Sequence, residues 1–269
     1  MDERPLLTSL SNPLVKRIRG LKTHKGRVEN GFFLVEGIHH VGSALEAGWV
    51  VDSLLYAPDL LNSDYAAILL EDARRSGLAP QAVSAKVIES LAEKDNPQGI
   101  LAVVKQRNLG FDDLHGFRHG VALVSPQDPG NVGTILRTID AINADALFLL
   151  DPLDGTRGSV ELYHPTCVRA SMGAIFWKPV VQSSFDEFVS WVKKGGYRLI
   201  GTSAHARKDY REATHRATPW ILLLGSEQKG LSSEQIEICD ETLSLPMHGK
   251  VSSLNLAVAA GILLYALNA

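Results

Sequence analysis

The chain has 269 residues, of which 45% are hydrophobic and 21% are charged, and its net charge is −3. This length suits one large domain or two of ordinary size, and the composition is typical of a soluble globular protein. The charged N-terminus has no apolar segment, so we expect a cytoplasmic protein without a secretory or transit peptide. No membrane span is expected, because the longest apolar run, Leu256 to Leu267, is short and rich in Ala and Gly.

The N-terminal segment is strongly basic although the whole protein is acidic. Between Arg4 and Arg27 it holds seven Lys and Arg residues and no Asp or Glu: Arg4, Lys16, Arg17, Arg19, Lys22, Lys25 and Arg27. A charge run is often only a solvated helix face. A run without compensating acids is also what contact with a phosphate backbone requires, so both interpretations remain open at this point.

The chain alternates helical periods with short β-rich runs, which predicts an α/β fold with a mainly parallel sheet. We predict helices over residues 12–23, 39–47, 64–76 and 85–93 and strands over 32–36, 51–56, 81–83 and 99–104. Residues 105–120 then lose this periodicity and gain Gly, Asp and His. We therefore predict a first domain over 1–106, a linker over 107–119 and a second domain over 120–269.

The second part repeats the alternation over a longer stretch. Strands are predicted at 121–125, 146–150, 179–182, 198–202, 221–225 and 241–245, and helices at 132–142, 165–176, 185–194, 233–239 and from 254 to the end. These six strands suffice for a doubly wound parallel sheet with ligand loops at its carboxyl edge. Cys167 and Cys239 lie far from each other and from any His at metal spacing, so we expect free thiols and no metal site.

Common nucleotide and hydrolase motifs are missing. The sequence has no G-x-G-x-x-G after a strand, no H-E-x-x-H and no G-x-S-x-G. The run from Gly225 to Gly230 has the glycine spacing of a phosphate loop, but Leu231 stands where the phosphate-binding lysine is required. A phosphate-loop nucleotide enzyme is therefore a weak alternative.

Three segments after predicted strands carry the polar residues that packing alone does not need. They are 128–138, with Asn131 and Arg137; 225–231, with Glu227; and 245–255, with Ser253 and Asn255. Each has an ordinary structural interpretation, since Asn131 or Ser253 could cap a helix and Arg137 could be a surface side chain. Glycine and polar residues at strand ends also let backbone approach and orient a ligand.

Taken in order, the three segments read N-x-G-x-x-x-R, G-x-E-x-x-G-L and L-P-M-x-G-x-x-x-S-L-N. This set strongly resembles the signature motifs of the SpoU class (TrmH type) of RNA ribose 2'-O-methyltransferases in the SPOUT superfamily. Residues 168–174 are also similar to that family. Residues 33–37 and 96–102 resemble its accessory substrate-binding domain, whose fold is like that of ribosomal protein L30e. In the last motif, Leu256-Ala257 replaces the commoner Val-Ser.

The resemblance implies a parallel, Rossmann-like SPOUT domain with a deep C-terminal trefoil knot, preceded by a smaller α/β domain. It implies S-adenosylmethionine as cofactor, a ribose 2'-hydroxyl as acceptor, a homodimer, and RNA as partner, ribosomal RNA before tRNA. The residues that it assigns to catalysis are Arg137, Asn131, Glu227, Ser253 and Asn255. It assigns Gly225, Leu245, Leu254, Thr202 and Met247 to the cofactor. For RNA binding the candidates are Lys16, Arg17, Arg19, Lys22, Arg169 and Ser171.

Two points stay open in the sequence. Arg137 could act as the general base, or, since arginine is effectively always protonated, as a charge that positions a phosphate and stabilises an alkoxide. A non-catalytic RNA-binding protein that keeps the fold is the alternative from another class. The presence of all five predicted catalytic residues argues against it.

Overall fold

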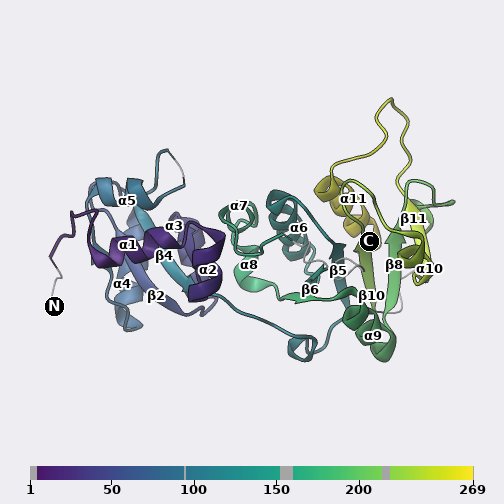
Figure 1. Ribbon diagram of the computed structural model, residues 1–269, viewed down its shortest axis with the longest axis horizontal. Coiled ribbons are helices and arrows are strands. Elements are labelled where there is room, and N and C mark those ends of the chain that lie inside the picture. The colour runs from purple at the N-terminus through teal and green to yellow at the C-terminus, as the bar shows by residue number, and fades with distance from the viewer. Residues whose placement is uncertain (1–4, 94, 152–159, 214–218, 269) are drawn as a thin grey trace. The chain divides into compact units, whose positions relative to one another are not determined.

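The computed structural model describes residues 5–93, 95–151, 160–213 and 219–268. The chain forms two compact units (Figure 1). The first comprises Met1–Arg107 and Tyr163–Phe176, and the second comprises Asn108–Leu162 and Trp177–Ala269. No helix among the described residues is long and apolar enough to cross a membrane.

The first unit is built on a four-stranded sheet in the order β1-β4-β2-β3. Its strands are β1 (Phe32–Glu36), β2 (Val51–Tyr56), β3 (Gln81–Ala82) and β4 (Ile100–Lys105). Strands β1 and β2 both run antiparallel to β4, and only β2 and β3 are parallel. The mainly parallel sheet predicted for the chain as a whole is therefore not found in this unit, whose sheet is mixed. The alternation of helices and strands does not determine which strands pair or in which direction they run. A mixed sheet produces the same alternation as a parallel one.

The helices of the first unit cover this sheet and supply its core. They are α1 (Pro13–Gly20), α2 (His24–Asn30), α3 (Ile38–Glu46), α4 (Asp64–Arg75), α5 (Ala85–Leu91) and α7 (Pro165–Ala170). Val15 and Ile18 of α1 pack with Leu101 and Val103 of β4 in one buried cluster. The single helix predicted over 12–23 is in fact two. Thr23 ends the first run, because its hydroxyl accepts a hydrogen bond from Gly26 N at 3.1 Å and so caps α2.

The helix predicted over 165–176 is also broken into two, α7 and the short α8 (Ala174–Trp177). The break lies at Met172 and Gly173, which adopt φ values of +50° and +93°. Helix α3 holds this segment through its two histidines. His40 Nε2 donates to Arg169 O at 3.3 Å, and His39 Nε2 donates to Met172 O at 3.2 Å. A stretch that lies between two strands of the second unit in sequence thus packs in the first unit.

The second unit contains a seven-stranded sheet in the order β7-β6-β5-β10-β8-β11-β9, with every neighbouring pair parallel. The strands are β5 (His119–Val124), β6 (Ala146–Leu150), β7 (Val180–Ser183), β8 (Arg198–Thr202), β9 (Lys208–Asp209), β10 (Trp220–Leu224) and β11 (Glu241–Ser244). The predicted parallel sheet is confirmed here, and β9 is an additional edge strand of two residues. Strand order reverses between β5 and β10, so the loops that follow these strands meet at one edge.

Helices flank this sheet and define where its loops go. They are α6 (Pro129–Ala141), α9 (Phe185–Gly195), α10 (Ser233–Glu237) and α11 (Leu256–Asn268), with short 3₁₀ turns η1 (Phe111–Asp113) and η2 (Tyr210–Glu212). Phe188 of α9 packs with Phe148, Ile221 and Leu223 on one face of the sheet. Helix α11 packs against α6 and β10. The three-residue run at η1 lies inside the predicted linker.

Two expected helix caps differ from the structure. Helix α6 begins at Pro129, and its cap is Asp128, whose Oδ1 accepts from Gly130 N at 2.7 Å. Asn131 therefore lies within the first turn of α6 rather than before it. Helix α11 begins at Leu256, and its first amides donate to Asn255 Oδ1 instead of to Ser253. Both asparagine side chains are thereby fixed at helix starts that face the carboxyl edge of the sheet.

Candidate active site

A cavity of about 770 Å³ lies at the carboxyl edge of the parallel sheet in the second unit. The loops after β8, β10 and β11 and the start of α11 line it. All five residues predicted to bind the cofactor are among the lining residues: Thr202, Gly225, Leu245, Met247 and Leu254. This volume is within the range of sites that hold a ligand the size of a nucleoside derivative.

The loop after β10 is closed tightly on itself. Gly230 N donates to Ser226 O at 2.9 Å, and Lys229 N donates to the Ser226 hydroxyl at 3.3 Å. A Cβ atom on Gly225 would lie 2.0 Å from the carbonyl carbon of Gly230, so the loop has no room for any side chain there. Gly225 is thus required first by the chain's own backbone, and the cavity is shaped by that closure.

Glu227 joins this loop to the start of α6. Its carboxylate accepts hydrogen bonds from Gln127 N at 3.2 Å, from Asp128 N at 3.4 Å and from the Asn131 side-chain amide at 3.1 Å. A negative charge at the N-terminus of a helix is favoured by the helix dipole and by the free amides of the first turn. Glu227 therefore fixes the position of α6 relative to the cavity.

Asn131 extends the same network to α11. Its amide nitrogen donates to Glu227, and its Oδ1 accepts from Asn255 Nδ2 at 2.9 Å. Asn131 is 8% exposed, so both of its polar atoms need partners. Asn255 in turn accepts from Ala257 N at 2.9 Å. One polar chain thus links the three signature segments, the first of which lies 96 residues before Glu227 and 124 residues before Asn255 in sequence.

Arg137 and Ser253 are placed differently. Ser253 is exposed and lines the cavity. Arg137 is exposed on α6, six residues beyond Asn131, which is about 9 Å along the axis and a third of a turn around it. It is not among the residues that line the cavity. Within one chain, the structure brings together Asn131, Glu227 and Asn255 but does not bring Arg137 to them.

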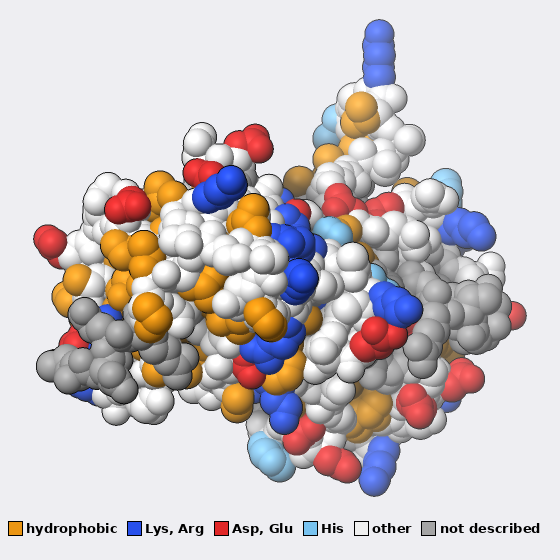
Figure 2. All heavy atoms as spheres, turned by 60° about the vertical axis from the view of Figure 1, so that its left-hand side comes forward, with side chains coloured by type: hydrophobic (Ala, Val, Ile, Leu, Met, Phe, Trp, Pro, Cys, Tyr) orange, Lys and Arg blue, Asp and Glu red, His pale blue; other side chains and the backbone are white. Residues whose placement is uncertain are grey.

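The segment between β11 and α11 stands out from the second unit. Figures 1 and 2 both show this loop rising above the surface. It carries Met247, and at its far end Leu254 and Asn255 return to the cavity wall and the polar chain. One side of the cavity is therefore formed by a loop that is exposed over most of its length.

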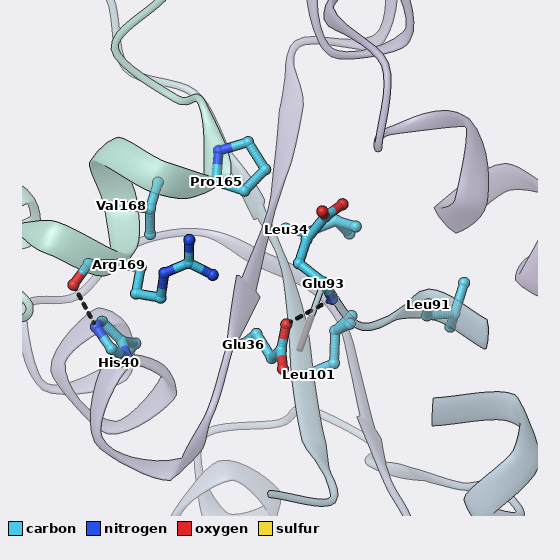
Figure 3. A pocket seen from close by; sticks show the side chains of 9 residues that line it. All are labelled: Leu34, Glu36, His40, Leu91, Glu93, Leu101, Pro165, Val168 and Arg169. Carbon is cyan, nitrogen blue, oxygen red and sulfur yellow. Dashed lines mark hydrogen bonds between the residues drawn. The ribbon is translucent and has the colours of Figure 1, made fainter. Parts of the chain in front are cut away.

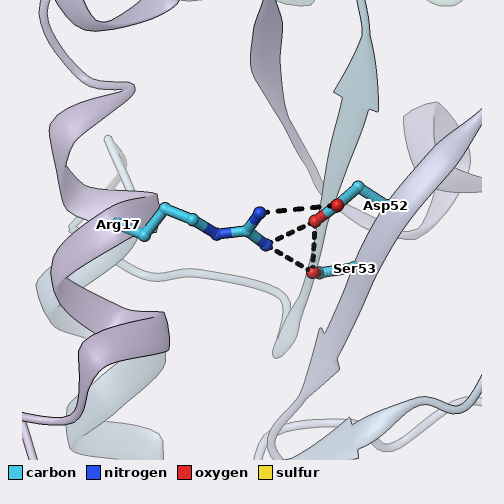
Figure 4. A network of polar contacts seen from close by, with 3 residues as sticks. All are labelled: Arg17, Asp52 and Ser53. Atoms are coloured by element: carbon cyan, nitrogen blue, oxygen red, sulfur yellow. Dashed lines mark hydrogen bonds and ion pairs between the residues drawn. The ribbon is translucent and has the colours of Figure 1, made fainter. Parts of the chain in front are cut away.

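Arg4 lies outside the described residues, and the other basic residues of the N-terminal segment are largely occupied by contacts within the first unit. Arg17 of α1 forms an ion pair with Asp52 of β2 and donates from Nη2 to the Ser53 hydroxyl at 3.0 Å (Figure 4). This guanidinium lowers the pKa of the Asp52 carboxyl. Lys22 Nζ donates to Ala92 O at 2.9 Å. These contacts attach α1 to the sheet and to α5.

The other predicted RNA-binding residues divide between internal and exposed positions. Arg19 Nη2 donates to the Ser90 hydroxyl at 3.3 Å, whereas Lys16 is exposed on α1. Arg169 is exposed on α7. Ser171 is 0% exposed, and its hydroxyl donates to Val168 O at 2.7 Å, so it holds the turn after α7 and presents no group to a ligand.

Two other titratable groups are shifted by burial and lie outside the cavity. Burial raises the pKa of Tyr163 to about 12, and its hydroxyl donates to Arg107 O at 2.7 Å. Burial raises the pKa of the Cys239 thiol to about 12 as well, and that thiol donates to Gln235 O at 3.1 Å. Such a thiol remains protonated at neutral pH and is a poor nucleophile.

Comparison with known proteins places these features in one family. Residues 118–265 match the SpoU rRNA Methylase family, and residues 12–102 match the MRM3-like substrate binding domain. The chain is 30% identical to the 23S rRNA (guanosine(2553)-2'-O)-methyltransferase RlmP of Bacillus subtilis over 96% of this chain and 97% of that protein. It is 34% identical to a 23S rRNA (uridine(2479)-2'-O)-methyltransferase of Streptomyces viridochromogenes over 89% of this chain and 83% of that protein.

Solved structures give the same result. An AdoMet-bound rRNA methyltransferase from Sinorhizobium meliloti superposes with a TM-score of 0.86 and 33% identity, over 98% of this chain and 97% of that one. The SpoU methyltransferase AviRb from Streptomyces viridochromogenes, in complex with AdoMet, superposes with a TM-score of 0.83 and 31% identity, over 96% and 98% of the two chains. Since the matches in sequence and in fold both extend over almost the whole chain, this protein belongs to the SpoU rRNA methylase family.

Proposed function

We propose that this protein transfers a methyl group from S-adenosylmethionine to a ribose 2'-hydroxyl of structured RNA. Ribosomal RNA of the 23S type is the favoured substrate, and tRNA is less favoured, because relatives along the whole chain are named as 23S rRNA 2'-O-methyltransferases. The observation that carries the proposal is the polar chain from Glu227 through Asn131 to Asn255. It joins the three signature segments beside the cavity.

The division of labour follows the two parts of the chain. Residues 1–106 would form an L30e-like domain that binds the RNA substrate. Residues 107–119 would link this domain to the catalytic SPOUT domain, which residues 120–269 would form. The loops after β10 and β11 would form the deep trefoil knot that the family resemblance implies. We place the protein in the cytoplasm, where a bacterial-type ribosomal RNA is modified.

The cavity residues fit the cofactor. Leu245, Leu254 and Met247 offer apolar surface for an adenine ring, and the tightly closed loop from Gly225 to Gly230 offers backbone groups. When bound, the cofactor supplies a methyl group on a sulfonium that is already activated for transfer. The protein's task is then to align the 2'-hydroxyl and to stabilise the charge that develops on its oxygen.

Arg137 is the residue that we assign to the RNA side of the reaction. Arginine keeps its proton in proteins, so we assign it the role of a cation that binds the phosphate next to the reacting ribose and stabilises the developing alkoxide. Asn131, Glu227 and Asn255 would hold α6 and α11 in place for this contact. Ser253, which lines the cavity, would hold the reacting groups in position.

Substituting Gly225 with alanine should weaken cofactor binding by at least roughly tenfold and lower the free energy of unfolding by about 1–3 kcal/mol. The reason is that the new Cβ would lie 2.0 Å from the Gly230 carbonyl carbon, so the loop must open. Titration calorimetry with S-adenosylmethionine and urea unfolding measure the two effects.

Gly249 provides a matched control within the exposed loop after β11. A Cβ atom added there meets nothing within 4 Å, so Gly249→Ala should leave both affinity and stability unchanged. Equal cofactor affinity in Gly225→Ala and wild type would show that the cavity at β10 is not the cofactor site.

We propose a homodimer through the catalytic domain. Val258, Ile262 and Tyr265 of α11 are 51%, 38% and 60% exposed and recur at helical spacing, so they form an apolar stripe on the outer side of the helix. Arg137 is exposed on α6, which packs beside α11. A second copy seated on this stripe would bring Arg137 of one protomer to face its partner.

A charged residue placed in the apolar stripe tests whether the stripe forms the dimer interface. Ile262→Asp should weaken the dimer at least about thirtyfold, because a carboxylate would be buried against apolar side chains. Sedimentation velocity of the full chain measures the shift from dimer to monomer. Val50, 61% exposed in the first unit, gives the control Val50→Asp, which should sediment like wild type. A wild-type monomer at micromolar concentration would refute the dimer.

The alternative, a non-catalytic RNA-binding protein with this fold, predicts a different result in one assay. Full-length protein is incubated with tritiated S-adenosylmethionine and unmodified ribosomal RNA. The enzyme should transfer label to the RNA, whereas a binding protein would retain RNA on a filter without labelling it.

A further inference from the structure

A second pocket, in the first unit, has no role in the account above (Figure 3). It lies where the two N-terminal segments that resemble the family's accessory domain meet. Glu36, at the end of β1, pairs with Leu101 of β4, and Gly37 N donates to Ile100 O at 3.2 Å. The pocket is lined by Leu34, Glu36, His40, Leu91, Glu93, Leu101, Pro165, Val168 and Arg169.

Glu36 is the unusual group in this pocket. Its Oε2 accepts from Glu93 N at 2.9 Å. Its Oε1 is buried and accepts no hydrogen bond from any residue that the structure describes. A buried carboxylate oxygen without a donor is unfavourable, and since the described residues supply none, Oε1 is open to a donor on a bound ligand.

The other charged residues of the pocket do not compete with Glu36 as an acceptor for a ligand. The Glu93 carboxylate has a cation, since Lys22 Nζ lies 3.7 Å from its Oε1. Arg169 is exposed, and its side chain reaches the pocket beside Val168 in Figure 3. His40 Nε2 fixes the backbone of this residue by donating to Arg169 O. Among the described residues, the pocket therefore presents the Glu36 carboxylate as an acceptor and the Arg169 guanidinium as a donor beside leucine and valine side chains.

We propose that this pocket recognises a guanine base of the RNA, an inference that rests on the proposed function. Guanine alone among the four bases presents two adjacent N–H donors, at N1 and N2, beside a carbonyl acceptor, O6. Glu36 accepts from N1 and N2, and Arg169 donates to O6. The pocket has a volume of about 30 Å³, which admits the amino group, while the ring would lie outside it against the apolar lining residues.

The experiment compares five fluorescein-labelled pentanucleotides, UUXUU, in which X is guanosine, inosine, adenosine, cytidine or uridine. Anisotropy with the full-length protein gives each affinity. Wild type should bind the guanosine RNA about tenfold more tightly than the others, inosine included, because inosine lacks the N2 amino group. Glu36→Gln should lose this preference, since its amide would place N–H donors against the N–H donors of the base.

Glu36→Gln keeps an oxygen that can accept from Glu93 N, so the fold should be retained, and thermal unfolding checks this. Glu29→Gln is the charge-matched control, because Glu29 lies on α2 outside the pocket and pairs with Lys25 at 3.7 Å. The Glu29→Gln variant should prefer the guanosine RNA as strongly as wild type does. Equal affinity for all five RNAs, a preference for another base, or a guanosine preference that survives in Glu36→Gln would overturn the proposal.

Methyl transfer to ribosomal RNA is measured in parallel and separates the two claims. If wild type methylates the RNA but shows no guanosine preference, the pocket proposal fails and the proposed function stands. If wild type prefers guanosine but transfers no methyl group, the proposed function fails and the base site stands.

Discussion

Arg137→Ala should lower the rate of methyl transfer at least about a hundredfold while the affinity for S-adenosylmethionine changes less than about twofold. Removal of a preorganised cation at a developing oxyanion has an effect of this size in other enzymes. Cofactor binding is spared because Arg137 lies on the exposed face of α6 and does not line the cavity. Single-turnover kinetics with saturating RNA and calorimetry with the cofactor measure the two quantities.

The control for this variant is Arg118→Ala. Arg118 is an exposed arginine that directly precedes β5, so it lies at the opposite edge of the same sheet from the cavity. It should keep wild-type turnover. If Arg137→Ala turned over at the wild-type rate, Arg137 would have no part in the mechanism, whether as base or as cation.

Asn131→Asp should disrupt the polar chain strongly, because it adds a charge while it keeps the size and shape of the side chain. The substitution removes the donor to Glu227 and sets a second carboxylate in its place, about 3 Å from the first. Because Asn131 is 8% exposed, the new carboxylate would be poorly solvated although Glu227 itself is exposed, and the free energy of unfolding should fall by about 1–3 kcal/mol. Methyl transfer should fall with it, because Glu227 loses the donor that connects it through residue 131 to Asn255.

Asn143→Asp is the matched control for that change. Asn143 is exposed, and its Oδ1 accepts from Lys178 Nζ at 3.1 Å, so a carboxylate there faces a cation. Its stability should stay within about 0.5 kcal/mol of wild type in urea titration. A wild-type unfolding midpoint in Asn131→Asp would mean that the contact with Glu227 does not form in solution.

Much of the fold could be predicted because the strands are short, apolar and bounded by turn residues. Four predicted strands, β1, β2, β6 and β8, have the bounds that the structure gives them. The mixed sheet of the first unit could not be predicted, since strand direction depends on which long-range pairs form. The break at Met172 was missed as well, because it depends on contacts with α3, which lies more than a hundred residues earlier.

The candidate site shows the same division between local and distant effects. The sequence predicted five of the residues that line the cavity and the three members of the polar chain. It did not show that Asn131 is held by both Glu227 and Asn255. The basic N-terminal run suggested free charges for RNA, but two of its residues form internal contacts with distant parts of the chain. Arg17 pairs with Asp52, and Lys22 donates to Ala92 O. Residues 33–37 resembled the accessory domain, but the sequence did not distinguish Glu36 within them, since its Oε1 is seen to lack a donor among the described residues only in the folded structure.

The position of the transferred methyl group tests the central claim most directly. Ribosomal RNA labelled by the wild-type protein with tritiated S-adenosylmethionine is hydrolysed in alkali, which cleaves RNA only where the 2'-hydroxyl is free. The account predicts that the label is recovered in alkali-resistant dinucleotides. Label in mononucleotides, which would place the methyl group on a base, or no transfer by protein that binds the cofactor, would contradict it.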